Sequence, residues 1–333
     1  MELSFEQIKS IAKGVVRVES NDGRIALLRF TKKQEDAYKD RNDDFFKKVF
    51  ATAGVRLEFS TNSTSLFLKT NVRPASSRRF CAHDIFCNGK LIGQLGASFN
   101  NFAPDVEPAE ISGKFYLGEG EKNVCIYFPW SFASEICELS LDDGSFVAPT
   151  EKSINMIMFG DSITHGYDAL LPSNSYASRV ADMLDANAIN KGIGGEVFWP
   201  ELADMTDDIT PDIITVAYGT NDWGGGCSSK EEFEQHCKAF YENLSKAYPH
   251  AKIFALSPIW RVDCQNPSKV GDFKYVHDYF DTLAAEIDNV IHLNAYDFVP
   301  HDVLMMGDRF VHPNDEGFEY YANALFAEIK KNI

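Results

Sequence analysis

The sequence predicts a mixed α/β protein of two domains, a β-sandwich followed by an open α/β domain. Up to about residue 149, short runs alternate apolar and polar residues, a pattern typical of antiparallel strands. From about residue 151, short apolar runs alternate with amphipathic stretches, which is typical of βα units around a mainly parallel sheet. Because one hydrophobic core rarely supports more than about 300 residues, we place the domains at residues 1–150 and 151–333.

In the first domain, a helix is expected over residues 4–12, before the alternating runs begin. The clearest strand patterns are three sets of alternating apolar residues: Val55, Leu57 and Phe59; Leu66, Leu68 and Val72; and Val124, Ile126 and Phe128. Turn signals separate such runs, namely Asn88-Gly89, Gly118-Glu119-Gly120 and Asp142-Asp143-Gly144. We therefore expect an antiparallel β-sandwich with a jelly-roll-like arrangement.

In the second domain, five short apolar runs are expected to form the strands of the parallel sheet: residues 154–159, 187–190, 212–218, 252–257 and 290–293. Three sets of apolar residues have helical spacing: Tyr176, Val180, Met183 and Leu184; Phe273, Val276, Phe280, Leu283 and Ile287; and Phe318, Tyr321, Ala322, Leu325 and Ile329. The order of these elements predicts helices that cover a parallel sheet.

Composition narrows the choice of partners. The chain has 49 acidic and 32 basic residues, a formal net charge of -17. This charge repels nucleic acid and anionic membrane surfaces, so we expect neither as a partner and favour a neutral substrate. The amino terminus shows no basic stretch followed by an apolar run, and no window approaches the roughly 18 apolar residues of a membrane span. A cytoplasmic location is expected, and the oligomeric state stays open.

Cysteine and histidine spacing gives no sign of a metal. The seven cysteines are scattered and form no Cys-x-x-Cys pair, which indicates free thiols. The eight histidines form no cluster with ligand spacing, so we expect no metal site.

Two motifs in the second domain indicate nucleophilic catalysis by a serine. Gly160-Asp161-Ser162 follows the run 154–159, so Ser162 should lie on a tight turn at the carboxyl end of a strand, where open α/β sheets carry their chemistry. A serine hydroxyl is a poor nucleophile until a base accepts its proton. His312, in the loop before the last predicted helix, is the candidate base because imidazole titrates near neutral pH.

Attack on a carbonyl also requires hydrogen-bond donors for the oxyanion. The expected donors are the backbone N–H groups of Ser162 and Gly195 and the side-chain amide of Asn221, which follows the third strand. Gly192 and Gly194 are as permissive as Gly195, so the residues alone leave the choice among the three open. The acids beside the motifs, Asp161 and Asp222, are expected to support their turns rather than to react.

These segments resemble the four blocks of the SGNH (GDSL) hydrolase superfamily: Gly160-Asp161-Ser162, Gly195, Gly219-Thr220-Asn221-Asp222 and His312-Pro313. The resemblance covers about residues 152–332. It implies a flavodoxin-like three-layer α/β/α fold, no cofactor, and esterase, acetylesterase, lipase or thioesterase activity. The preceding β-sandwich resembles that of two-domain carbohydrate esterases in the same superfamily.

The sequence departs from the family in one place. The family usually has its catalytic Asp three residues before the His, where this chain has Arg309, and the nearest upstream acid is Asp308. Either the loop carries one extra residue and Asp308 still orients His312, or a backbone carbonyl replaces the acid. We prefer Asp308.

Residues close to the motifs suggest how a substrate is held. His165 either lines the site or is a solvated loop residue, and Trp223, Trp260 and Arg261 either wall a cleft or pack beneath it. The expected function is a serine esterase that hydrolyses short-chain acyl esters, acetyl esters first, of a small molecule or an oligosaccharide. The alternatives are a lipase or thioesterase of the same superfamily and a non-enzymatic carbohydrate-binding protein.

A metal-dependent phosphoesterase is a further rival, because Asp161, Asn221, Asp222 and His312 are possible ligands. A two-metal site needs more His and Asp ligands at the ends of other strands, and the chain has no Asp-x-His or Gly-Asn-His segment to supply them. The metal hypothesis is therefore the weaker one.

Overall fold

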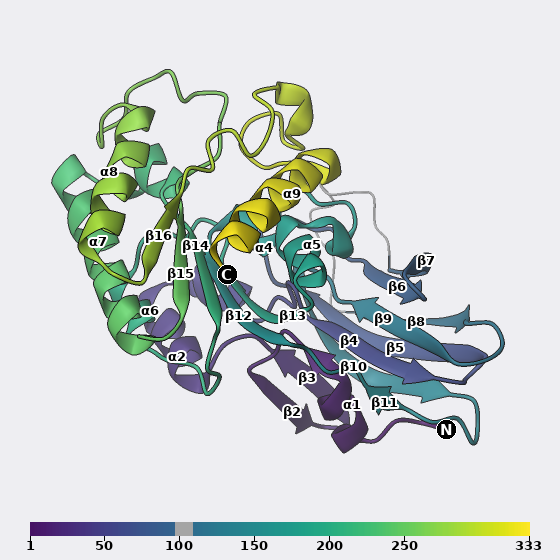
Figure 1. Cartoon of the computed structure of the whole chain (residues 1–333). Helices are drawn as coiled ribbons and strands as arrows, with labels where there is room; N and C mark the ends of the chain where they lie inside the picture. Colours follow the sequence, from purple (N-terminus) through teal and green to yellow (C-terminus); the bar gives the residue numbers. More distant parts are fainter. Residues whose placement is uncertain (97–108) are drawn as a thin grey trace. The chain divides into compact units, whose positions relative to one another are not determined.

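The computed structural model describes residues 1–96 and 109–333, and Figure 1 shows the course of the chain. The chain divides into two compact units, one of residues 1–152 with 171–173 and one of residues 153–170 with 174–333. The compact units divide after Lys152, close to the boundary expected near residue 150. The assignment of residues 1–150 and 151–333 as separate domains stays a prediction.

The first unit contains two antiparallel sheets, with strand orders β1-β4-β9-β6-β7 and β2-β3-β10-β5-β8; β11 pairs with β4. The strands are β1 Ala12–Lys13, β2 Arg17–Asn21, β3 Arg24–Leu28, β4 Arg56–Thr61, β5 Ser65–Pro74, β6 His83–Cys87, β7 Lys90–Leu95, β8 Ala109–Tyr116, β9 Lys122–Tyr127, β10 Phe132–Leu141 and β11 Ala148–Pro149. The predicted β-sandwich is confirmed, and its jelly-roll connectivity stays a prediction.

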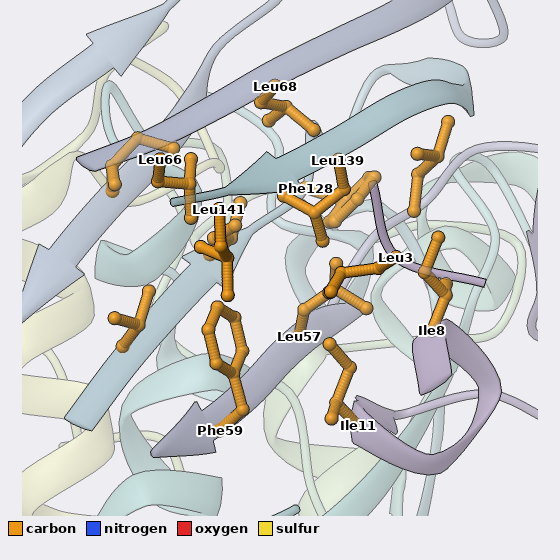
Figure 2. Packing of buried hydrophobic residues seen from close by; sticks show 14 of the residues in the cluster. Leu3, Ile8, Ile11, Leu57, Phe59, Leu66, Leu68, Phe128, Leu139 and Leu141 are labelled. Atoms are coloured by element: carbon orange, nitrogen blue, oxygen red, sulfur yellow. The ribbon is translucent and has the colours of Figure 1, made fainter. Parts of the chain in front are cut away.

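Alternation along the strands produces the core of this unit. In β5 every second residue from Leu66 to Val72 is buried. Leu66 and Leu68 share one hydrophobic cluster with Leu57 and Phe59 of β4, which Figure 2 shows at close range. The predicted amino-terminal helix is α1, Phe5–Ile11, and its Ile8 and Ile11 side chains add to the same cluster.

The structure has two helices in a part of this unit where the sequence pattern predicted strands. They are α2, Lys32–Arg41, and α3, Asp43–Val49. The segment is rich in charged residues and has no long apolar stripe, so periodicity could not reveal it. Its start is set by a capping box in which Thr31 Oγ1 accepts from Gln34 N at 3.2 Å and Gln34 Oε1 accepts from Thr31 N at 3.0 Å. End capping, not amphipathic patterning, therefore specifies α2.

The second unit is built on a parallel sheet with the order β13-β12-β14-β15-β16. Its strands are β12 Ile154–Gly160, β13 Ala186–Gly192, β14 Ile213–Ala217, β15 Lys252–Leu256 and β16 Val290–Leu293, so each predicted strand is confirmed. Figure 1 shows α7 and α8 on one side of the sheet and α5 and α9 on the other. The α/β/α fold class predicted for this part is confirmed.

The helices of this unit are α4 Ser162–His165, α5 Tyr176–Met183, α6 Pro200–Ala203, α7 Lys230–Ala247, α8 Phe273–Glu286 and α9 Asp315–Asn332; the short turns are η1 Pro172–Asn174, η2 Asp222–Gly226 and η3 Val303–Met305. The stripe predicted for α9 is fully buried. In α5 the prediction was wrong for Met183, which is 37% exposed. Tyr176 of α5 stacks on Tyr321 of α9, with ring centroids 4.2 Å apart.

All seven cysteines are free thiols, as the scattered spacing predicted. Among residues 1–96 and 109–333, no helix is both long and apolar enough to span a membrane.

Candidate active site

The candidate nucleophile lies where β12 ends. Asp161 caps α4, and its Oδ1 accepts a hydrogen bond from Ile163 N at 2.9 Å. This turn places Ser162 at the first position of α4. Gly160 is required because a Cβ there would lie 2.0 Å from Thr164 Oγ1. The strand–turn–helix predicted from Gly160-Asp161-Ser162 is therefore present.

Three side chains form a continuous hydrogen-bonded chain. His312 Nε2 lies 2.7 Å from Ser162 Oγ, and His312 Nδ1 lies 2.6 Å from Asp308 Oδ2. An ionised carboxylate only accepts hydrogen bonds, so Nδ1 carries the ring proton and Nε2 is left to accept from the serine hydroxyl. This is the arrangement in which an imidazole can remove the serine proton.

The loop before His312 explains the four-residue spacing from Asp308. Asp308 Oδ1 accepts from the backbone N–H groups of Phe310, Val311 and His312, at 2.9, 2.9 and 3.1 Å. Arg309 has a φ of 61°, so the chain makes a tight left-handed turn between the acid and the histidine. Burial raises the pKa of Asp308, but the hydrogen bonds from His312 and the backbone outweigh it and hold the pKa well below its usual range.

The expected oxyanion donors have the following geometry. The N–H of Ser162 is the first of α4 and has no acceptor inside that helix. Gly195 has a φ of 88°, a conformation that favours glycine, and within the described residues its N–H makes no hydrogen bond. Asn221 donates from Nδ2 to Glu196 O at 2.9 Å, which ties its amide to the residue after Gly195.

The two other glycines of this run have different tasks. The N–H of Gly192 already donates to Asn190 Oδ1 at 2.8 Å. Gly194 packs so tightly that a Cβ there would lie 2.2 Å from Tyr167 Oη. These contacts favour Gly195 as the donor, a role that stays a prediction.

Two buried carboxyls support the turns, in line with the expectation for Asp161 and Asp222. Asp222 accepts from the N–H groups of Phe198 and Gly219, both at 3.1 Å. Burial raises the pKa of Asp161 to about 6 and that of Asp222 to about 7, because desolvation disfavours their charged forms.

Three of the four residues expected to bind substrate are buried. His165 is fully buried, with its ring edge-on to Tyr167, so it does not line an open surface. Trp223 is buried and donates from Nε1 to Gly271 O at 2.9 Å. Arg261 is buried between the rings of Trp223 and Phe310, 5.0 and 5.2 Å from their centroids. For Trp223 and Arg261 the packing alternative fits better, whereas for His165 the alternative of a solvated loop residue is wrong because the side chain is buried.

Trp260 is only partly buried and stacks on His301, with centroids 5.5 Å apart and an interplanar angle of 14°. The sequence reading missed two neighbours of the histidine. The ring of Tyr167 lies 5.5 Å from that of His312, and Asp168 Oδ2 lies 3.7 Å from His312 Nδ1. Their signal in the sequence was their place five and six residues after Ser162.

Ligand atoms of Asp168, Asp308 and His312 lie within 4.8 Å of one another. Among the described residues, this is the group whose spacing could hold a cation. The histidine nitrogen that faces this group already bonds to Asp308 Oδ2 at 2.6 Å. We therefore interpret the cluster as a hydrogen-bonded acid–imidazole pair.

Residues 158–320 match the model of the GDSL-like Lipase/Acylhydrolase family. That segment is therefore similar to this family, and the match together with the solved structures below indicates an ester-hydrolysing enzyme. No curated protein sequence matches the chain.

Solved structures share the fold at low identity. The salicylyl-acyltransferase SsfX3 from a tetracycline biosynthetic pathway is 20% identical with a TM-score of 0.80, and the match covers 96% of this chain and 94% of that one. A candidate GDSL-like lipase from Bacteroides ovatus is 19% identical with a TM-score of 0.77, covering 99% and 97%. A family two carbohydrate esterase from Cellvibrio japonicus is 16% identical with a TM-score of 0.69, also covering 99% and 97%.

Proposed function

We propose that the protein is a serine esterase that removes short acyl groups, acetyl first, from carbohydrate esters. The single observation that carries this proposal is the chain of hydrogen bonds from Asp308 through His312 to Ser162 Oγ, with distances of 2.6 and 2.7 Å. Such a chain makes a neutral serine nucleophilic at a pH where free serine is not.

The proposed reaction has two acyl-transfer steps. Ser162 Oγ attacks the ester carbonyl while His312 Nε2 takes its proton, and the N–H groups of Ser162 and Gly195 with the Asn221 amide hold the oxyanion. His312 returns the proton to the leaving alcohol, which departs and leaves an acyl-serine. A water molecule, deprotonated by His312, then attacks the acyl carbonyl and releases the acid and the free serine.

The substrate class rests on similarity of fold. Several solved structures of the same fold are described as family two carbohydrate esterases, and one as an acetyl xylan esterase. The net charge of -17 favours a neutral substrate such as an acetylated oligosaccharide over a polyanion. We therefore propose acetylated sugars as the first compounds to test.

A second candidate is acyl transfer to an acceptor alcohol instead of water. It is favoured by the salicylyl-acyltransferase, whose TM-score of 0.80 accompanies coverage of 96% of this chain. Both reactions share the acyl-serine and differ in what attacks it. The ratio of acid to new ester, measured with added sugar or alcohol acceptors, separates them.

The first experiment measures hydrolysis of p-nitrophenyl acetate and butyrate by the wild type and by Ser162→Ala, with and without EDTA. We expect turnover that survives EDTA, favours acetate and falls by at least about 10⁴-fold in the variant. Loss of wild-type activity in EDTA would support metal chemistry instead. No turnover of either ester or of acetylated sugars, combined with sugar binding, would support the binding-protein alternative.

A further inference from the structure

A second carboxylate lies beside the histidine. Asp168 Oδ2 is 3.7 Å from His312 Nδ1, while Asp308 Oδ2 is 2.6 Å from the same atom. Both acids are mostly buried, with side chains only 12% and 21% exposed. A charge at this distance and burial is weakly screened, so it acts on the protonated ring.

The backbone holds Asp168 in an uncommon conformation. Its φ is 70°, in the left-handed region that only Gly, Asn and Asp adopt readily. The residues on either side are fixed, since Tyr167 N donates to Ser162 O at 3.0 Å and Ala169 N donates to Gly166 O at 3.2 Å. The loop that follows Ser162 is therefore folded back so that this acid faces the histidine.

The opposite loop is shaped to receive Asp168. A Cβ added at Gly307 would lie 2.8 Å from Asp168 Cβ, so only glycine permits this approach. Gly307 precedes Asp308 and donates its N–H to His312 O at 2.8 Å. Two loops from distant parts of the chain thus meet at the Asp168 side chain.

The two acids stand differently to the ring of His312. Asp308 Oδ1 accepts three backbone N–H groups and its Oδ2 accepts from His312, so both oxygens are committed. Asp168 reaches the same nitrogen from another loop without bonding to it. It can therefore contribute charge while Asp308 supplies the hydrogen bond.

We propose that Asp168 is a positioning residue for the reaction, a second carboxylate that stabilises the protonated ring of His312 and accepts from Nδ1 when Asp308 is removed. This inference rests on the proposed esterase function. When Ser162 Oγ attacks, its proton moves to His312 Nε2 and the ring gains one positive charge. Asp308 keeps its hydrogen bond to Nδ1, and Asp168 adds a second negative charge on the same side; neither acid takes the proton.

Other groups that face the His312 ring also affect its protonation in any pH test. They are Asp161, whose charge acts on His312, Tyr167, whose ring lies 5.5 Å away, and the Ser162 hydroxyl. Asp168→Asn leaves all of them in place, and asparagine tolerates a φ of 70°. The variant therefore removes one charge with little effect on the backbone.

The test compares Asp168→Asn, Asp168→Glu, Asp308→Ala and the double variant Asp168→Asn/Asp308→Ala. Asp297→Asn is the matched control, because it removes one carboxylate from an 84% exposed side chain that pairs with His301. The readouts are kcat and KM for p-nitrophenyl acetate, the pH profile of kcat/KM, and the titration of the His312 ring followed by NMR, which needs no turnover.

We expect Asp168→Asn to lower kcat about 10-fold with KM unchanged, and to move the acid limb of the pH profile about one unit lower, because a lost negative charge disfavours the protonated ring. Asp168→Glu keeps the charge and should retain more kcat than Asp168→Asn, but less than the wild type, because glutamate disfavours a φ of 70°. Asp308→Ala should lose about 10²-fold and the double variant about 10⁴-fold, the loss typical of a triad without its acid. Asp297→Asn should match the wild type.

The inference is overturned if Asp168→Asn matches Asp297→Asn in kcat and pH profile, or if the double variant is no worse than Asp308→Ala. A loss of kcat in Asp168→Asn with an unmoved acid limb and an unmoved His312 titration would also overturn it, since that indicates a purely structural role. If the wild type shows no turnover, the esterase proposal fails, and the NMR titration still decides whether Asp168 acts on the ring.

Discussion

At the scale of single residues, side chains of the candidate site also hold the loops around them. Asp308 uses one oxygen to fold its own loop and the other to hold His312. Asn221 lies at the start of η2 and holds the loop of Gly195 through Glu196 O. Such double use fixes the reactive groups before substrate arrives, which is how an enzyme avoids reorganising its dipoles during the reaction.

Asn221→Ala tests the oxyanion role. We expect kcat to fall about 100- to 1000-fold with little change in KM, because the amide acts on charge that develops only in the transition state. Loss of the bond to Glu196 should cost only about 1 kcal/mol of stability. Steady-state kinetics and urea unfolding measure both effects.

Asn243→Ala is the matched control, since its amide donates to Pro200 O at 3.1 Å on the surface of α7, outside the candidate site. It should keep wild-type kcat. Full activity in Asn221→Ala would remove this residue from the mechanism.

At the scale of elements, the helices α2 and α3 of the first unit depend on a buried arginine. Arg29 is fully buried, and it donates from Nε to Ala51 O at 2.6 Å and from Nη2 to Lys48 O at 3.1 Å. Lys48 O lies in the last turn of α3 and Ala51 O lies beyond it. Carbonyls at the end of a helix lack the N–H of a following helical turn. Burial lowers the pKa of Arg29 to about 9, so the side chain stays charged at neutral pH.

Arg29→Met is expected to destabilise the first unit by about 3 kcal/mol, because the buried carbonyl of Ala51 loses its bond to Nε, whereas Lys48 O keeps Ala51 N as a donor at 3.1 Å. Urea unfolding followed by circular dichroism measures the loss. Arg24→Met serves as control: Arg24 is 43% exposed and pairs with Glu110 at 3.5 Å, so its loss should cost less than about 0.5 kcal/mol. Equal effects of the two substitutions would contradict the role given to Arg29.

At the scale of the whole molecule, the chain carries two compact units, and buried acids in the second unit link its stability to pH. Burial raises the pKa of Asp161 to about 6 and of Asp222 to about 7, from the usual 3.8. Between about pH 4 and pH 7 the folded state therefore holds protons that the unfolded state releases. Linkage then makes the unfolding free energy fall as the pH rises through this window.

Asp222→Asn should flatten this dependence, because asparagine has no proton to lose. Between pH 4.5 and pH 7.5 we expect the wild type to lose about 3 kcal/mol more than the variant. The variant should be less stable than the wild type at pH 4.5, since an amide oxygen replaces only one of the two acceptors. Urea unfolding at the two pH values, with the exposed Asp297→Asn as control, makes the comparison. Parallel pH dependence in all three proteins would show that Asp222 is already ionised.

Local patterns in the sequence determined much of the secondary structure of the second unit. The five strands of the parallel sheet, the helix α9 and the turn at Ser162 follow from runs of apolar residues, helical spacing and the small residues Gly160 and Gly195. These signals are readable because they depend on neighbours a few residues apart, whose spacing must match 2 or 3.6 residues per repeat. The order of the four motifs that resemble the family was likewise visible in the chain.

Tertiary structure decided the rest, because it brings together residues that the sequence keeps far apart. Ser162 and His312 are 150 residues apart, and only folding brings Oγ within 2.7 Å of Nε2. Folding also placed Asp308 on Nδ1 and Asp168 next to it, and it buried His165, which spacing alone had left as a candidate for substrate contact. Burial and side-chain contact depend on the packing of distant segments, so a local pattern does not contain them.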